Sequence, residues 1–204
     1  MPASPQAPTP PKVAVLPWAW IGGTDTAVKT GKDTINALFN GVNFEIVPEA
    51  RTKTAWQDGM NMSAMKERLE EKDSDPSLPT PKELLKLGKM MDVDFVCAGF
   101  ARWHTKSVWI ALGPKTKADC TVTMEIVDVK KEEVALDSKA VKSDDTRKES
   151  GLETAGALLL TAGITAFSGG PKTPHQQKSV SNAIALSMEP WLKTRAAAGR
   201  KIGG

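Results

Sequence analysis

The sequence contains no tyrosine, and its 204 residues include only two cysteines and two histidines. A structural zinc site needs four close nitrogen or sulfur ligands, and no such group occurs, so we expect no bound metal and no cofactor. No run of about 20 apolar residues is present, which excludes a helical membrane-spanning segment. The aromatic side chains are six tryptophans and five phenylalanines, and tryptophan can serve either a core or an interface.

An excess of charge of one sign is also missing. The 27 basic and 24 acidic residues leave a formal net charge of +3. Basic and acidic side chains alternate in short stretches such as 66–68 and 130–133. Nucleic-acid-binding domains usually gather lysine and arginine on one face, whereas interleaved charges are typical of solvated helix faces and turns. We therefore expect no nucleic-acid partner. A cytoplasmic ligand- or nucleic-acid-binding α/β domain remains the alternative.

The common catalytic patterns are missing as well. There is no Gly-x-Ser-x-Gly elbow, and neither His104 nor His175 has a nucleophile near it in sequence. Gly31-Lys32 follows a strand and looks like part of a phosphate-binding loop, but Asp33 stands where that loop requires serine or threonine. We predict a binding domain and not an enzyme, with a catalytic site assembled from distant residues as the alternative.

The paired acids and the cysteines have structural explanations. Asp92 and Asp94 bracket a helix-to-strand corner, where aspartate commonly ends one element and begins the next. Cys97 and Cys120 lie in apolar runs and are expected to be buried thiols. A disulfide between neighbouring strands is the alternative, and it would require an oxidising compartment.

We expect three parts along the chain. Residues 1–11 carry prolines at positions 2, 5, 8, 10 and 11 and form a disordered, extended tether. Residues 12–193 form a single α/β domain, which is long enough to bury a core. Residues 194–204 are small and basic and form a flexible tail.

Apolar periodicity predicts a strand–helix–strand unit at the start of this domain. The unit consists of Lys12–Trp18, a helix that is capped by Thr24 or Asp25 and runs to about Asn40, and Asn43–Val47. Such a βαβ unit places its two strands in parallel.

The sequence then predicts helices, an antiparallel meander and further helices. One helix covers about 61–71, and another begins at Thr80, which forms a capping box with Glu83. From Val93 the apolar period changes to two, which predicts the strands Val93–Trp103, Ser107–Leu112, Lys117–Val129 and Glu133–Val141. The last helices are expected over Leu152–Phe167 and from His175, with Pro190 kinking or ending the second. The predicted fold class is α/β (α+β), with the βαβ unit and the meander in one mixed sheet and helices packed on it.

Three motifs, in this order, resemble a family of bacterial envelope proteins. They are Lys12–Trp18 (KVAVLPW), Val93–Gly99 (VDFVCAG) and Glu125–Val129 (EIVDV), the last followed by a turn and Glu133-Val134. The family includes the curli secretion channel subunit, lipoprotein activators of penicillin-binding proteins, and the amino-terminal domain of the TolB translocation protein. The likeness covers about Lys12 to Val141.

The resemblance implies a non-enzymatic, periplasmic or outer-membrane-associated domain that assembles with itself or with another envelope protein. Members are often lipid-anchored, and the proline-rich start would fit a tether below an anchor upstream of the given sequence.

Trp18, Trp20 and Trp109 are the candidate interaction surface. Trp18 and Trp20 flank Pro17 where the first strand ends and a glycine-rich loop begins, and Trp109 lies beside a Gly-Pro turn. Binding groups collect at strand ends and loops, and desolvated tryptophans often dominate interface energies. The alternative is that these rings cover the core of the sheet itself.

Overall fold

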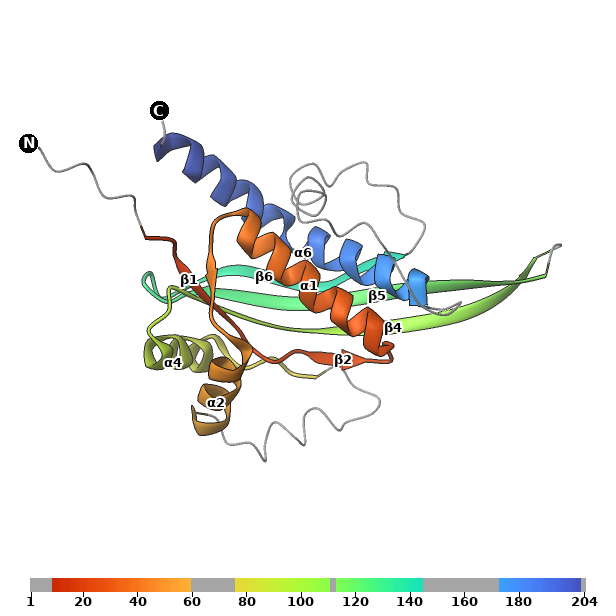
Figure 1. The fold of residues 1–204 in the computed structure, drawn as a ribbon, viewed down its shortest axis with the longest axis horizontal. Helices are drawn as coiled ribbons and strands as arrows, with labels where there is room; N and C mark the ends of the chain where they lie inside the picture. The colour runs from red at the N-terminus through yellow and green to blue at the C-terminus, as the bar shows by residue number, and fades with distance from the viewer. Residues whose placement is uncertain (1–8, 60–75, 111–112, 145–172, 203–204) are drawn as a thin grey trace, which may run out of the picture.

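The computed structural model describes residues 9–59, 76–110, 113–144 and 173–202 (Figure 1). In this part of the chain six strands form one mixed sheet: β1 (Lys12–Val15), β2 (Ala19–Ile21), β3 (Glu45–Ile46), β4 (Phe95–Ile110), β5 (Gly113–Asp128) and β6 (Glu133–Asp144). The strand order is β3–β1–β4–β5–β6, and β2 pairs with β4 beyond the end of β1. Within the same ranges four helices pack on this sheet, which confirms the predicted α+β fold class: α1 (Asp25–Gly41), α2 (Glu49–Gly59), α4 (Pro81–Met91) and α6 (Thr173–Ile202).

The predicted βαβ unit is confirmed. β1 and β3 are parallel, with Val13 opposite Ile46, and α1 connects them. The hydroxyl of Thr24 caps α1 by accepting a hydrogen bond from the backbone N–H of Ala27 at 3.3 Å. The helix ends at Gly41, after which the chain returns to the sheet.

The first predicted strand is divided in two. Instead of one strand over Lys12–Trp18, β1 ends at Val15 and β2 begins at Ala19, and both pair in parallel with successive parts of β4. Pro17 explains the interruption because it has no backbone N–H to donate to the ladder.

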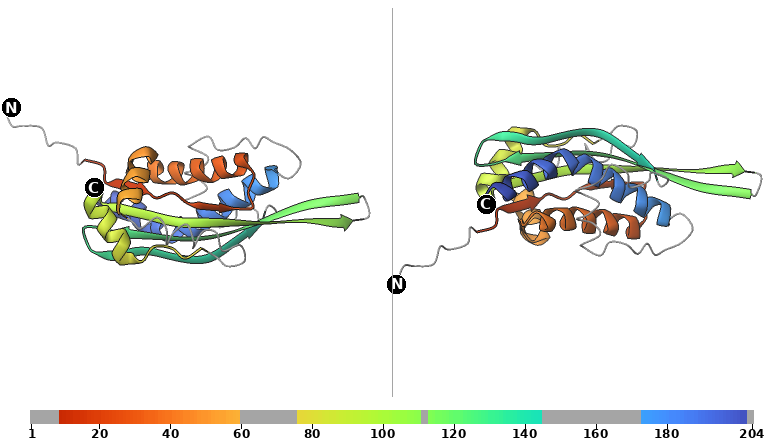
Figure 2. Two further views of the ribbon diagram at one scale, coloured as in Figure 1. Left: turned by 90° about the horizontal axis from the view of Figure 1, so that it is seen from below. Right: turned by 90° about the horizontal axis from the view of Figure 1, so that it is seen from above.

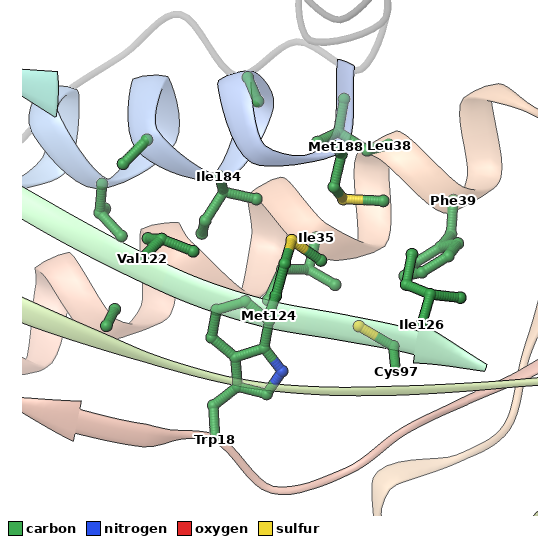
Figure 3. Packing of buried hydrophobic residues seen from close by; sticks show 14 of the residues in the cluster. Trp18, Ile35, Leu38, Phe39, Cys97, Val122, Met124, Ile126, Ile184 and Met188 are labelled. Atoms are coloured by element: carbon green, nitrogen blue, oxygen red, sulfur yellow. The ribbon is translucent and has the colours of Figure 1, made fainter. Parts of the chain in front are cut away.

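Helices cover both faces of the sheet because β1 is apolar on both sides. Val13 packs in the core beneath α1 and α6, whereas Ala14 and Leu16 pack in a second core against α2 and α4. Figure 1 shows α1 and α6 above the sheet and α2 and α4 below it. In the first core, Ile35 and Leu38 of α1 meet Ile184 and Met188 of α6 above Val122, Met124 and Ile126 of β5 (Figure 3).

The meander contains longer strands than the sequence predicts. The expected break near residues 104–106 is wrong, because β4 runs unbroken for 16 residues to Ile110, and β5 is equally long. His104, Thr105 and Lys106 interrupt the apolar alternation without interrupting the backbone ladder, in which each faces a residue of β5. The two strands form a long hairpin that extends beyond the helices (Figures 1 and 2).

The helices differ from the prediction in two places. α2 was not expected, because only Thr52 and Trp56 are buried among those of its side chains that the structure describes, and such a narrow stripe gives little periodic signal. α6 continues past Pro190 to Ile202 and thus enters the range 194–204, for which flexibility stays a prediction. The capping box of Thr80 and Glu83 at the start of α4 is confirmed. The helices expected over 61–71 and 152–167 lie outside the described residues.

Candidate functional site

Three indole rings form a row on the face of the sheet that α1 and α6 cover, and we call Trp18, Trp20 and Trp103 the tryptophan row. The ring centroids of Trp18 and Trp20 are 5.3 Å apart and the rings are stacked, while those of Trp20 and Trp103 are 6.0 Å apart. Trp18 is 8% exposed and Trp103 is 5% exposed, whereas Trp20 is half-buried. Of the predicted interaction residues, Trp18 therefore lies in the core and Trp20 at its boundary.

Glycines hold the rings of the row in place. A Cβ atom at Gly99 of β4 would come within 2.6 Å of Trp18 Cζ2, and one at Gly31 of α1 would come within 2.5 Å of Trp20 Cζ3. Such distances are far below van der Waals contact, so no other residue type fits without displacing a ring. Gly31, which looked in sequence like part of a phosphate-binding loop, instead allows the Trp20 ring to pack directly on the helix.

A cavity of 440 Å³ lies beside Trp18 and Trp20, at the carboxyl ends of β1 and β3. It forms because β3 ends at Ile46, so that within the described residues β2 pairs only with β4. Val28 and Ile35 of α1 line one side, and the chain that follows β3 lines the other. Sequence reasoning missed this cavity, because one of its sides is formed by the start of α2, a helix that was not expected.

The cavity also lies at the point where the connections between strands switch from one face of the sheet to the other. β1 lies between β3 and β4, and the chain reaches β3 through α1 on one face and β4 through α2 and α4 on the other. In open α/β sheets, ligands bind outside the carboxyl ends of the strands at such a topological switch point. The position of the cavity is thus typical of a ligand site.

Charged side chains stand at the rim of the cavity. Lys32 Nζ of α1 and Glu49 Oε1 of α2 are 2.8 Å apart, and this ion pair joins the two helices. Lys53, one turn further along α2, is exposed and adds a second cation. Two cations and one carboxylate leave the rim with a net positive charge.

The outer part of the β4–β5 hairpin forms a second candidate site. β4 last pairs with β2 at Arg102, and β5 last pairs with β6 at Asp119. At the base, Gln176 of α6 donates from Nε2 to Thr105 Oγ1 at 3.1 Å. Beyond that point, within the described residues, the two strands pair only with each other. We call residues 106–110 and 113–117 the arm.

The arm holds the third predicted interaction residue, Trp109, whose backbone faces Pro114. Its side chain is outside the described part of the structure, so its role stays a prediction. Between residues 106 and 117 the sequence has three lysines and no acid. Lys106 and Lys117 face each other across the hairpin and both are exposed, an arrangement that is unfavourable without a counter-charge.

Elsewhere the charges are mixed and neighbouring acids pair with lysines. Such ion pairs occur on α1, on the β5–β6 turn and on β6, as Lys29–Asp33, Lys131–Glu133 and Lys139–Asp137 show. The distribution is that of a solvated surface, and it differs from the acid-free sequence of the arm.

Asp94 has a structural role at the corner where it was expected. Its Oδ2 accepts a hydrogen bond from the backbone N–H of Lys12 at 2.7 Å, and its Oδ1 is paired with Lys130. Partial burial would raise the pKa of Asp94, but the hydrogen bonds and charges of Lys130 and Lys12 outweigh it and hold that pKa below its ordinary value. The carboxylate thereby joins the start of β1 to the β5–β6 turn.

The histidine that lies in the hairpin is on the surface. His104 Nδ1 is 3.7 Å from Asp119 Oδ2, and the His104 side chain is 52% exposed. Within the described ranges, no three histidine, cysteine, aspartate or glutamate side chains come together as metal ligands. Among the same residues, no helix is both long and apolar enough to cross a membrane.

Cys97 and Cys120 are buried free thiols, as favoured from the sequence. Cys97 faces Ile126 and Cys120 faces Trp103, so the two cysteines are six positions apart along the hairpin. That separation is about 20 Å at the usual rise per residue, well beyond the reach of a disulfide. Burial raises the pKa of both thiols, and for Cys120 the charge of Asp119 raises it further, so neither is reactive at neutral pH.

No known protein family matches this sequence, and no curated protein matches it either. Similar chains occur among solved structures. The lipoprotein GNA1162 from Neisseria meningitidis has a TM-score of 0.43 and 15% identity over 76% of this chain and 96% of that one. A PelC dodecamer from Paraburkholderia phytofirmans has a TM-score of 0.41 and 17% identity over 90% and 89%. The LpoB C-terminal domain from Salmonella enterica has a TM-score of 0.37 and 15% identity over 67% and 81%.

One of these three structures, GNA1162, is a lipoprotein, and LpoB belongs to one branch of the envelope family that the motifs resemble. The three do not include a curli channel subunit or a TolB domain. At such identities and TM-scores the likeness does not assign this chain to a family.

Proposed function

We propose that this chain is a non-enzymatic binding domain that acts through protein–protein contacts at the cell envelope, in the periplasm or at the outer membrane. The observation that carries the proposal is the arm. A two-stranded ribbon is marginally stable in water unless a further strand, a helix or a partner packs against it. The described residues supply no such neighbour beyond Thr105, so a second copy of the chain or another protein is expected to cover the arm.

The composition of the arm indicates what the partner offers. Apolar residues 108–112 stand between lysines at 106 and 115, so we expect an apolar patch bordered by acidic side chains. Aromatic residues often dominate such contacts, which makes Trp109 the first residue to test. The envelope location is supported by the three sequence motifs, and the non-enzymatic character by the structural roles of Asp94 and the two thiols.

The register of the hairpin allows the arm to be removed cleanly. Thr105 faces Ala118, so an Asn-Gly turn can replace residues 106–117 and close the hairpin at that pair. Lys131→Ala in the β5–β6 turn serves as the matched control, because it changes a lysine on the other hairpin connection.

Sedimentation velocity over a range of concentrations would measure self-association. A photoreactive amino acid at position 109 would capture another partner in cells. We expect the shortened variant to keep its melting temperature and to lose the assembly or the adduct, while Lys131→Ala keeps both. The proposal fails if the arm-shortened chain assembles like the original, or if position 109 cross-links to lipid alone.

A further inference from the structure

The cavity beside Trp18 and Trp20 has the size and walls of a small-molecule site. Its 440 Å³ lie within the range of about 300–1,000 Å³ that is usual for ligand pockets. Aliphatic side chains from three directions line it, namely Val15 at the end of β1, Val28 on α1 and Val47 after β3. Gly31 and Gly99 leave room for the two indole rings, and the packed rings form one wall of the cavity.

The indole rings of Trp18 and Trp20 in this wall differ from that of Trp103 in their hydrogen bonding. Within the described residues, the buried indole N–H groups of Trp18 and Trp20 have no hydrogen-bond partner. By contrast, Trp103 in the same row donates from Nε1 to the backbone carbonyl of Gln176 at 3.0 Å. The two N–H groups are closed off from solvent, so the rings offer their apolar surface, and not a donor, to the cavity. Trp191 also has an unpartnered indole N–H, but it lies away from the cavity, among Phe39, Phe44 and Phe95.

The charges at the rim of the cavity favour a ligand that carries a negative charge. Glu49 is paired with Lys32, which leaves Lys53 to bind a negative group. Glu49 also stands in the first turn of α2, where it offsets the partial positive charge of the helix N-terminus, so the cationic character of the rim comes from Lys32 and Lys53. An apolar interior with a cationic rim is complementary to an amphiphile with an acidic head.

We propose that this cavity binds an acidic amphiphile, a molecule with an apolar body and a single carboxylate or phosphate group. The apolar body packs against the rings of Trp18 and Trp20 and the valines. The head group lies at the rim beside Lys53. The site shares no residue with the arm, so it is independent of the proposed assembly, and either proposal can fail alone.

Dodecanoate and dodecyl phosphate distinguish the two sources of the acidic group. Calorimetric titration of the full chain below the critical micelle concentration is expected to show saturable one-to-one binding of at least one of them. The tighter anion identifies the head group, and dodecanol and dodecyltrimethylammonium serve as neutral and cationic counterparts. In a ¹⁵N–¹H spectrum the indole N–H signals of Trp18 and Trp20 should shift on binding, whereas that of Trp191 should not.

Variants separate the cavity from the general surface. Val28→Trp fills it, and Asn36→Trp obstructs its rim from an exposed position that does not endanger folding; each should weaken binding at least about tenfold. Lys53→Ala should weaken binding of the anions about two- to fivefold and leave dodecanol unchanged. Lys29→Ala, on α1 but outside the cavity, should have no effect.

Three results would overturn the proposal. They are the absence of saturable binding by either anion, binding that survives both tryptophan substitutions, and equal affinity for the cationic and anionic amphiphiles.

Discussion

The indole ring of Trp20 lies directly against Gly31, so close that a Cβ atom at position 31 would be 2.5 Å from Trp20 Cζ3. Glycine inside a helix normally costs about 1 kcal/mol relative to alanine. Here glycine stands at the position of α1 against which the Trp20 ring of β2 packs. This contact fixes both the tryptophan row and one wall of the cavity.

Gly31→Ala should therefore destabilise the protein, by about 1–3 kcal/mol in the free energy of unfolding, because the ring must move in a packed region. The sign should reverse when the ring is absent. In a Trp20→Leu background, Gly31→Ala should stabilise by up to about 1 kcal/mol through helix propensity alone. Denaturant unfolding of the four proteins in this cycle measures both values, and a destabilisation of equal size in both backgrounds would show that Trp20 is not the cause.

Asp94 should make stability depend on pH in the acid range. Its folded pKa lies below the ordinary value of 3.8, so its contribution is present above that value and is lost as the pH falls through the folded pKa. Asp94→Asn should lower stability at pH 7 by about 1 kcal/mol and flatten the acid limb of the profile. Unfolding free energies between pH 2 and 7 test this, with the exposed Asp33→Asn as control.

Glu125 should act in the opposite direction. Burial raises the pKa of its carboxyl, Asp137 directly across the β5–β6 ladder raises it further, and Lys139 opposes them. Ionisation is therefore less favourable in the folded chain, and stability should decline as the pH rises from the unfolded pKa through the folded one. Glu125→Gln should remove this decline and leave the protein more stable at pH 7. A loss of stability at pH 7 would mean that the charge of Glu125 is satisfied.

Trp109→Ala should separate assembly from stability. Within the described residues the backbone of residue 109 pairs only with Pro114, so the substitution should change the free energy of unfolding by less than about 0.5 kcal/mol while weakening association. Trp18→Ala is the comparison, because removing a core tryptophan should cost about 3–5 kcal/mol. Thermal unfolding and sedimentation, run on the same samples, give the two quantities. A core-sized loss for Trp109→Ala would exclude it from the interaction surface.

Local signals in the sequence were sufficient for much of the fold. The cap at Thr24, the capping box at Thr80 and the change of period at Val93 involve residues within a few positions of one another, and each predicted its element. The mixed sheet followed from these elements.

Features that depend on distant residues were missed. The cavity requires α2 to begin at Glu49 directly after β3, and the sequence of α2 has little local pattern. Glycine is needed at position 31 because of its contact with Trp20, a residue of another element. The arm was read as broken because His104–Lys106 are polar, although a two-stranded ladder is held by backbone hydrogen bonds and does not require apolar side chains at each position.

The central claim is that the arm is covered by a protein partner, and backbone amide hydrogen exchange tests it most directly without altering the sequence. At dilutions where the chain is monomeric, amides of the arm should exchange rapidly, while those of Val13–Val15 in the centre of the sheet stay protected. On assembly, at high concentration or with the captured partner, arm protection should rise at least about tenfold and that of Val13–Val15 should not change. Arm amides that exchange equally fast under all of these conditions would contradict the account.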